Sequence, residues 1–237
     1  MEVRFVAVGE LLVDVLAEGT GHDARIRLGP AGSAFNAAAA AVAAGARATV
    51  IGTVGNDAAG RMILAELAAR GVDAEVAVAE GPTGTFLLAD GAVRVDRGVS
   101  HDLVLPGRIE ADALLVSGYV PAAARALAAA DAEWVALDAA RLSELPPGGN
   151  AVFASGAQHD PHRLAEGRRL AVVTHGAEGA VAVMGDRVER SVPASAAEDA
   201  PGSGDVFAAT LLVALARGHE LADALEGATR AALDSLS

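Results

Sequence analysis

The chain has 237 residues, a length that suits one α/β domain with a small appendage and allows a sizeable core. Its net charge of −13 and its pI near 4.8 disfavour nucleic acids and anionic membranes as partners, because those polyanions would repel it. Cysteine and lysine are absent, which excludes disulfides, thiol nucleophiles, Walker-type P-loops and Schiff-base chemistry. We therefore expect a protein that acts on a soluble metabolite.

The N-terminal segment indicates a cytoplasmic location. It has no long apolar core and reaches Glu10 and Asp14 early, so it does not look like a signal peptide. The alanine-rich run at residues 37–44 is too short to cross a bilayer.

Short apolar runs alternate with helical patterns along most of the chain, which is typical of a three-layer α/β domain with a parallel sheet. Pro121 suits the first turn of a helix, and Gly71 suits a helix end. We expect residues 1–237 to form one domain. The predicted strands are residues 5–8, 49–54, 113–117, 134–138, 151–154, 170–174 and 181–184, and the predicted helices are residues 33–44, 58–70, 121–130, 162–166, 205–217 and 221–236.

Two regions lack this alternation. Residues 11–28 and 75–97 show short alternating patterns with glycine-rich turns and no helix between them. They predict a small β appendage, and such a flap commonly acts as a lid that excludes water from a reaction site. Simple edge hairpins would give the same pattern.

The start of the first long helix carries an unusual polar residue. Asn36 lies among small apolar residues in the segment 31–38 (AGSAFNAA), and burying its amide is costly unless a partner is present. A hydroxyl of a polyol is one such partner. A role as a helix-capping or core amide remains open.

Near the C-terminus, residues 199–205 (DAPGSGD) form a glycine-rich turn that leads into an apolar helix. Glycines let the backbone approach a ligand, and the first N–H groups of a helix attract anions such as phosphate. Asp205 stands where it could take a proton from a reacting hydroxyl. The same residues also fit an ordinary turn and helix cap.

These motifs resemble the signatures of the ribokinase-like, or PfkB, carbohydrate kinases. Residues 31–38 are similar to the first signature, residues 51–60 (IGTVGNDAAG) to the stretch that follows it, and residues 199–205 to the second signature, usually Asp-Thr-x-Gly-Ala-Gly-Asp. The three matches fall in the family's order, and similarity extends from Gly9 to about Arg217. The resemblance implies a three-layer α/β/α ribokinase-like sandwich with a small β lid.

The resemblance also implies roles for individual residues. Asp205 would be the catalytic base, and residues 172–179 (VVTHGAEG) resemble the nucleotide-binding Thr-x-Gly-x-x-Gly, although a tight turn between strands would look the same. Arg97 matches an arginine that sugar-acid kinases use near the substrate; as bare sequence it could be solvated surface. The implied sets are Gly202, Ser203 and Gly204 with Asp205 for catalysis, Asp14, Gly32, Ser33, Asn36 and Arg97 for the acceptor, and Thr174, Gly176 and Gly179 for the nucleotide.

The implied activity is ATP-dependent phosphorylation of a hydroxyl on a small sugar or sugar acid, closest to fructokinases and 2-keto-3-deoxygluconate kinases. Mg²⁺ would be carried by the ATP phosphates, since residues 153–158 (FASGAQ) lack the carboxylate of the family's Asn-x-x-Glu motif. No residue is assigned to a metal: His159 and His162 fit a turn better than a metal site. Relatives often pair through their lids, which implies a homodimer.

Three alternatives remain. A nucleoside kinase on the same fold would need aromatic or apolar groups to hold a base, and aromatic residues make up only 3% of the chain. A weakly catalytic sugar-binding or regulatory protein would keep the pocket without turnover. A Rossmann dehydrogenase is disfavoured because Phe207 stands where the third glycine of its motif would be.

Overall fold

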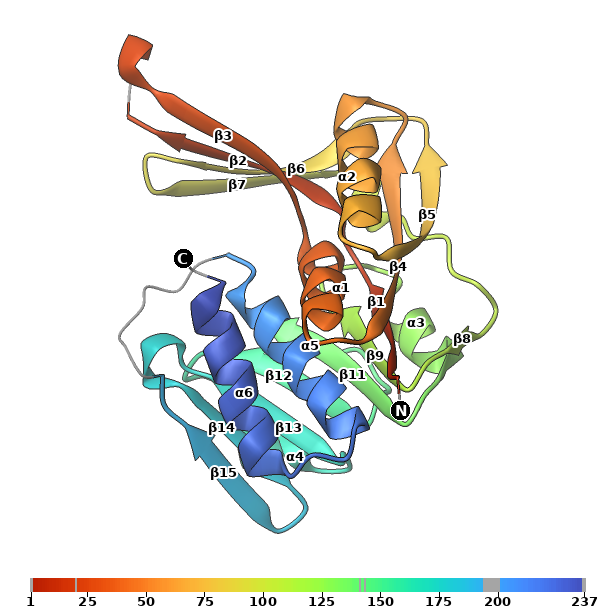
Figure 1. Cartoon of the computed structure of the whole chain (residues 1–237), viewed down its shortest axis with the longest axis vertical. Helices are drawn as coiled ribbons and strands as arrows, with labels where there is room; N and C mark the ends of the chain where they lie inside the picture. Colours follow the sequence, from red (N-terminus) through yellow and green to blue (C-terminus); the bar gives the residue numbers. More distant parts are fainter. Residues whose placement is uncertain (1, 20, 141, 143, 194–200, 236–237) are drawn as a thin grey trace.

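The computed structural model describes residues 2–19, 21–140, 142, 144–193 and 201–235. Its centre is a nine-stranded sheet in the order β15-β14-β13-β12-β11-β9-β1-β4-β5 (Figure 1). The strands from β13 to β5 in this order are parallel, and β14 and β15 run antiparallel at one edge. The strands are β1 (Arg4–Val8), β4 (Arg47–Gly55), β5 (Asp73–Ala79), β9 (Ala113–Ser117), β11 (Trp134–Ala140), β12 (Ala151–Ser155), β13 (Leu170–Thr174), β14 (Ala180–Met184) and β15 (Arg187–Ser191).

Helices cover both faces of this sheet, as the sequence pattern predicts. Successive side chains of a strand point to opposite faces, so Phe5 and Ala7 pack into one core while Val6 and Val8 pack into the other. Burial of a leucine such as Leu211 stabilises the fold by about 1.5–3 kcal/mol. The first core includes α1 (Ser33–Ala43), α2 (Ala58–Ala69), α5 (Ser203–Ala216) and α6 (Leu221–Asp234), and the second includes α3 (Ala123–Ala129) and α4 (Pro161–Ala165).

A second sheet of four strands projects from the body of the molecule (Figure 1). Its order is β3-β2-β6-β7, and we call it the lid: β2 (Leu12–Glu18), β3 (Arg25–Ala31), β6 (Thr83–Ala89) and β7 (Ala92–Gly98). Asp14 pairs with Phe86, and Phe86 pairs with Val95, so these three side chains lie on one face of the lid. Short pieces complete the fold: β8 (Ile109–Glu110) with β10 (Ala130–Asp131), and 3₁₀ turns at Gly21–Asp23, Val99–His101 and Gly176–Glu178.

The structure corrects several boundaries. Residues 75–79 are not part of the lid, because α2 returns the chain so that β5 pairs in parallel with β4. The main sheet is not wholly parallel, because β14, which the pattern predicted at residues 181–184, pairs antiparallel with β13. The pattern did not predict β15, which pairs antiparallel with β14. Pro121 lies before α3 rather than in its first turn. Residues 199 and 200 of the second signature lie outside the described residues.

The helix that the pattern predicted to begin at Asp205 begins at Ser203 instead, because Gly202 takes a left-handed conformation and ends the preceding turn. Within the described residues, no helix combines the length and the apolar character needed to cross a membrane.

Candidate active site

A cavity of about 480 Å³ lies at the carboxyl ends of the parallel strands. The chain first builds outward from β1 to β4 and β5, and later places β9 on the other side of β1. Ligands of open α/β sheets bind where the strand order reverses in this way. The strand ends contribute Glu10 after β1, Tyr119 after β9, Asp138 in β11, Ser155 in β12 and Thr174 in β13.

The fold brings all of the sequence-predicted site residues to this one cavity. They come from the lid, from α1, from β13 and the turn after it, and from the start of α5. In the sequence, these residues lie as far apart as Asp14 and Asp205. The residues are Asp14, Gly32, Ser33, Asn36, Arg97, Thr174, Gly176, Gly179, Gly202, Ser203, Gly204 and Asp205.

The start of α5 forms a cradle of backbone groups. Gly202 has a φ of 91°, and a Cβ there would lie 2.6 Å from Nδ2 of Asn36, so a side chain is excluded both by conformation and by space. At Gly204 a Cβ would meet no atom within 4 Å, which leaves the space before this residue open. The N-terminus of a helix carries positive partial charge, so the cradle suits an anionic oxygen.

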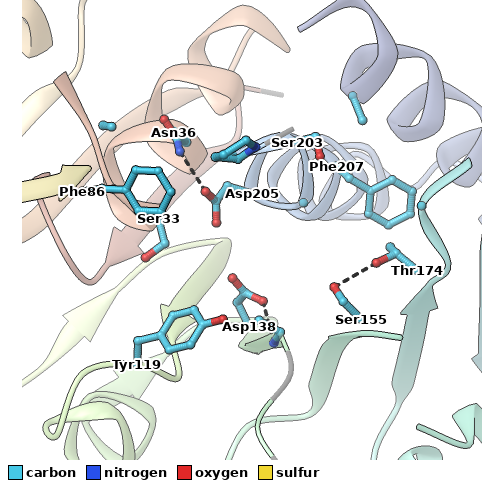
Figure 2. A pocket seen from close by; sticks show the side chains of 18 of the residues that line it. Ser33, Asn36, Phe86, Tyr119, Asp138, Ser155, Thr174, Ser203, Asp205 and Phe207 are labelled. Carbon is cyan, nitrogen blue, oxygen red and sulfur yellow. Dashed lines mark hydrogen bonds between the residues drawn. The ribbon is translucent and has the colours of Figure 1, made fainter. Parts of the chain in front are cut away.

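Asn36 orients the carboxyl group of Asp205. Its Nδ2 donates a hydrogen bond of 2.9 Å to Oδ2 of Asp205, which joins the first turns of α1 and α5 (Figure 2). The sequence left the partner of this amide open, and in the structure it is the predicted base. Ser33, one turn earlier on α1, has a buried Oγ with no hydrogen-bond partner among the described residues, so a ligand hydroxyl could pair with it.

Asp138 is a second, partly buried acid that the sequence pattern did not place in the site. Trp134, Ala136 and Asp138 alternate along β11, and the first two pack in the core beneath α1 and α5. The carboxyl group of Asp138 therefore faces that of Asp205 (Figure 2). Oδ1 of Asp138 accepts the N–H of Ala140 at 3.1 Å. The signal in the sequence was an acid at the end of a buried strand.

The two acids are partly buried in the same part of the cavity, and this changes their titration. Burial raises the pKa of Asp138 to about 6. Burial, followed by the negative charge of Asp138, raises the pKa of Asp205 well above its usual value. The hydrogen bond from Asn36 acts in the opposite direction by stabilising the ionised form. The charge of one carboxyl group opposes ionisation of the other, so the pair titrates as a unit.

At the lid end of the cavity, Arg97 is bound to the protein itself. Its Nη1 donates to Oε1 of Glu10 at 2.8 Å and to the backbone oxygen of Tyr119 at 2.7 Å. Its guanidinium also lies 5.6 Å from the centroid of the Tyr119 ring. Burial raises the pKa of Glu10, and the charge of Arg97 partly offsets this effect. Asp14 is half-buried nearby, and burial raises its pKa to about 6.

The opposite end of the cavity is lined by small and apolar groups. Thr174 ends β13 with its hydroxyl 3.0 Å from that of Ser155 (Figure 2). The 3₁₀ turn Gly176–Glu178 follows, and α6 supplies Thr229, Ala232 and Leu233. This end has room for the flat, apolar part of a ligand whose anionic part lies at the cradle.

The described residues contain no group of three or more His, Cys, Asp or Glu side chains that could hold a metal ion. His162 lies in α4, where its backbone N–H is accepted by Asp160 at the helix start. A protein-only metal cage is therefore not part of the described site.

The comparisons with known proteins identify the family. The family model described as pfkB family carbohydrate kinase matches residues 4–141 and 153–234. The chain therefore belongs to the pfkB family of carbohydrate kinases. This confirms the resemblance of the two sequence signatures, and it makes the protein a phosphotransferase.

Solved structures confirm the ribokinase-like α/β fold of this pfkB-family kinase. An adenosine kinase from Sinorhizobium meliloti superposes with a TM-score of 0.79 at 21% identity, over 100% of this chain and 94% of that one. A ribokinase from Thermotoga maritima gives a TM-score of 0.81 at 18% identity, over 99% and 93% of the two chains. A ribokinase from Arabidopsis thaliana, complexed with ribose and ATP, gives 0.76 at 19% identity, over 98% and 92%.

None of the curated protein sequences compared gives a significant match to the pfkB-family kinase. These structural relatives are ribokinases and an adenosine kinase, so the finer likeness to fructokinases and 2-keto-3-deoxygluconate kinases stays a prediction.

Proposed function

We propose that this kinase transfers the terminal phosphoryl group of ATP to a hydroxyl of a small sugar, with Asp205 as the base. The observation that carries the proposal is the position of Asp205: its carboxyl group is held by Asn36, lies beside the glycine cradle of α5, and opens onto the cavity. A base must be within reach of the acceptor hydroxyl and next to the site where phosphoryl charge develops. The position of Asp205 beside the cradle and at the cavity supports this role.

Different residues of the chain would have different roles in phosphoryl transfer. The amides around Gly202, Ser203 and Gly204 stabilise the charge on the migrating phosphoryl group, and Asp205 takes the hydroxyl proton as the new O–P bond forms. Asp14, Ser33 and the other acceptor residues orient the sugar so that one hydroxyl points at Asp205. The buried, unpartnered Oγ of Ser33 supports this placement.

ATP would lie with its phosphates at the cradle and its base toward Thr229 and Leu233. The turn between Gly176 and Gly179 borders that path. The Arabidopsis thaliana relative, complexed with ribose and ATP, supports this choice of donor. Mg²⁺ keeps phosphate and water ligands readily, so it would arrive with the nucleotide and neutralise phosphate charge.

The test of the base is Asp205→Asn. The side chain keeps its shape and its contact with Asn36 but can no longer take a proton, so kcat should fall on the order of 10²-fold or more. Sugar affinity measured by calorimetry should change little. Asp223→Asn is the matched control, since Asp223 is exposed in the first turn of the neighbouring helix α6. Normal turnover by Asp205→Asn would show that another group is the base.

A nucleoside kinase is a second candidate, and one observation favours it. Aromatic residues are scarce in the chain, yet Phe86, Tyr119 and Phe207 all line the cavity. Phe86 and Tyr119 flank the acceptor end, where a base could stack (Figure 2). An ADP-release assay over ketoses, aldoses and nucleosides separates the two candidates. Calorimetric sugar binding without ATP consumption would instead favour a binding or regulatory protein.

We also propose that the kinase forms a homodimer through its lid. Four apolar residues on the lid strands are exposed by 45–65%: Ile26, Leu28, Val93 and Val95. Exposed apolar residues grouped on one projecting element are typical of an interaction surface.

A further inference from the structure

The acceptor end of the cavity holds more negative than positive charge. Four of the cavity-lining residues are acids, while one of the described lining residues is a cation, Arg97. The acids are Glu10, Asp14, Asp138 and Asp205. A protein built to bind an anionic acceptor would be expected to present a free arginine or lysine there, and the chain has no lysine.

Glu10 balances the charge of Arg97, so the ion pair as a whole offers no net positive charge to an anionic group. Nη1 of Arg97 is held by Oε1 of Glu10 and by the backbone oxygen of Tyr119. The Glu10 side chain is 6% exposed. Moving Arg97 toward a ligand carboxylate would leave the buried Glu10 charge without its partner, which is strongly unfavourable.

Among the residues that the structure describes, Asp14 has no ion-pair partner of this kind. Burial raises the pKa of Asp14 to about 6, so at neutral pH its carboxyl group is largely ionised. It shares a face of the lid with Phe86 and Val95, both of which line the cavity. A ligand in contact with this face therefore meets an uncompensated carboxylate between apolar groups.

We infer that the acceptor is an uncharged polyol that donates hydroxyl hydrogen bonds to Asp14, and that sugar acids and phosphorylated sugars are rejected. The inference rests on the proposed function and selects between the two acceptor classes that the sequence resemblance left together. Arg97, which matches an arginine that sugar-acid kinases use near the substrate, neutralises Glu10. An anionic acceptor would bring a third negative group into a cavity that already holds Asp14 and the Asp138–Asp205 pair.

The experiment compares matched acceptors in an ADP-release assay at saturating Mg-ATP. The pairs are D-fructose with 2-keto-D-gluconate, D-glucose with D-gluconate, D-ribose with D-ribonate, and adenosine with its 3′-monophosphate. For the accepted skeleton, kcat/KM of the uncharged member should exceed that of the anion by about tenfold or more, because like charges repel at close range. A smaller difference, or a preference for the anion, overturns the inference and leaves the kinase proposal standing. If no compound is phosphorylated, the kinase proposal falls and the inference falls with it.

A pair of variants tests whether the charge balance between Glu10 and Arg97 causes this selectivity. Glu10→Gln leaves the charge of Arg97 uncompensated, so the ratio of kcat/KM for the anion to that for the uncharged member should rise by about tenfold. Glu18→Gln is the matched control, because Glu18 pairs with Arg27 on the exposed part of the lid and does not line the cavity. An unchanged ratio in a folded Glu10→Gln protein contradicts the inference. If that variant does not fold, Asp14→Asn must raise the same ratio, and its failure to do so has the same meaning.

Discussion

Asp138, near the end of β11, and Asp205, in the first turn of α5, turn their carboxyl groups toward each other (Figure 2). Burial and mutual repulsion favour a shared proton, while Asn36 favours the ionised form of Asp205. A base works only when it is ionised, so the proton on this pair must leave before transfer. Asp138 is thereby a positioning residue: it acts on the reaction through the protonation of Asp205.

Asp138→Asn should move the acidic limb of the kcat profile to lower pH. Activity rises with pH as Asp205 ionises; removing the negative charge of Asp138 lowers the pKa of Asp205, so ionisation occurs earlier. The profile is measured between about pH 5 and pH 8, where a base of raised pKa titrates. Asp223→Asn, on the exposed start of α6, should leave the limb in place. A limb that stays fixed or moves to higher pH in Asp138→Asn contradicts this role.

At the scale of elements, the junction of β4, α2 and β6 ties the lid to the body. Asp57 caps α2 by accepting the N–H of Gly60 at 2.7 Å, and it also accepts the N–H and the hydroxyl of Thr83 at 2.8 and 2.7 Å. Thr83 begins β6, the lid strand that carries Phe86, and its hydroxyl accepts the N–H of Gly55. One carboxylate therefore joins a helix start to the base of the lid.

Asp57→Ala should lower the free energy of unfolding by about 2–3 kcal/mol, because it removes a cap and two further hydrogen bonds. The matched control is Asp160→Ala, which removes only the cap of α4 and should cost about 1 kcal/mol. Urea denaturation measures both. Equal losses in the two variants would show that the contacts with Thr83 add nothing.

The Asp57 effect should also depend on pH. Burial tends to raise the pKa of Asp57, but the hydrogen bonds from Gly60 and Thr83 outweigh it and lower the pKa below 3.8. The stabilisation is thus present above pH 3.8 and is lost as the pH falls through the folded-state pKa. The difference between Asp57→Ala and the unchanged protein should shrink in acid.

At the scale of the whole molecule, the lid projects outward from the body of the protein (Figure 1). Leu28 pairs with Val15 and Val15 with Leu87, which places apolar side chains together on the face opposite Asp14. Val93 pairs with Leu88 on the face that carries Asp14 and Phe86. Both faces of the projecting part are therefore apolar, and a single chain leaves Leu28 and Val93 more than half exposed.

Light scattering should give the mass of a dimer for the unchanged protein, well above the 23.6 kDa of one chain. Leu28→Glu and Val93→Glu each place a charge on one face of the lid, and at least one of them should produce the monomer mass. Val104→Glu is the control, because Val104 is 69% exposed but lies outside the lid. A monomer mass for the unchanged protein contradicts the proposed homodimer.

Local patterns determined much of this fold from the sequence. Apolar runs predicted seven strands of the main sheet within a few residues, and helical spacing predicted the six helices, because core burial imposes those periods. Two ordered signatures predicted the family. The glycine turn before α5 predicted an anion cradle, since φ above zero and free helix amides are properties of short segments.

Contacts between distant segments were decided only in the tertiary structure. The alternation of apolar and polar residues at 75–79 fits a strand of the lid as well as a strand of the main sheet. Their parallel pairing with β4 places them in the main sheet. Asn36 meets Asp205 across 169 residues, and Asp138 meets the same acid from a third element. Arg97 lies in the cavity wall as expected, but its charge is cancelled by Glu10, 87 residues away. Local sequence patterns indicate which residues are buried and where the chain turns. Electrostatic partners depend on which distant residues the fold brings close together, and a local pattern does not contain that information.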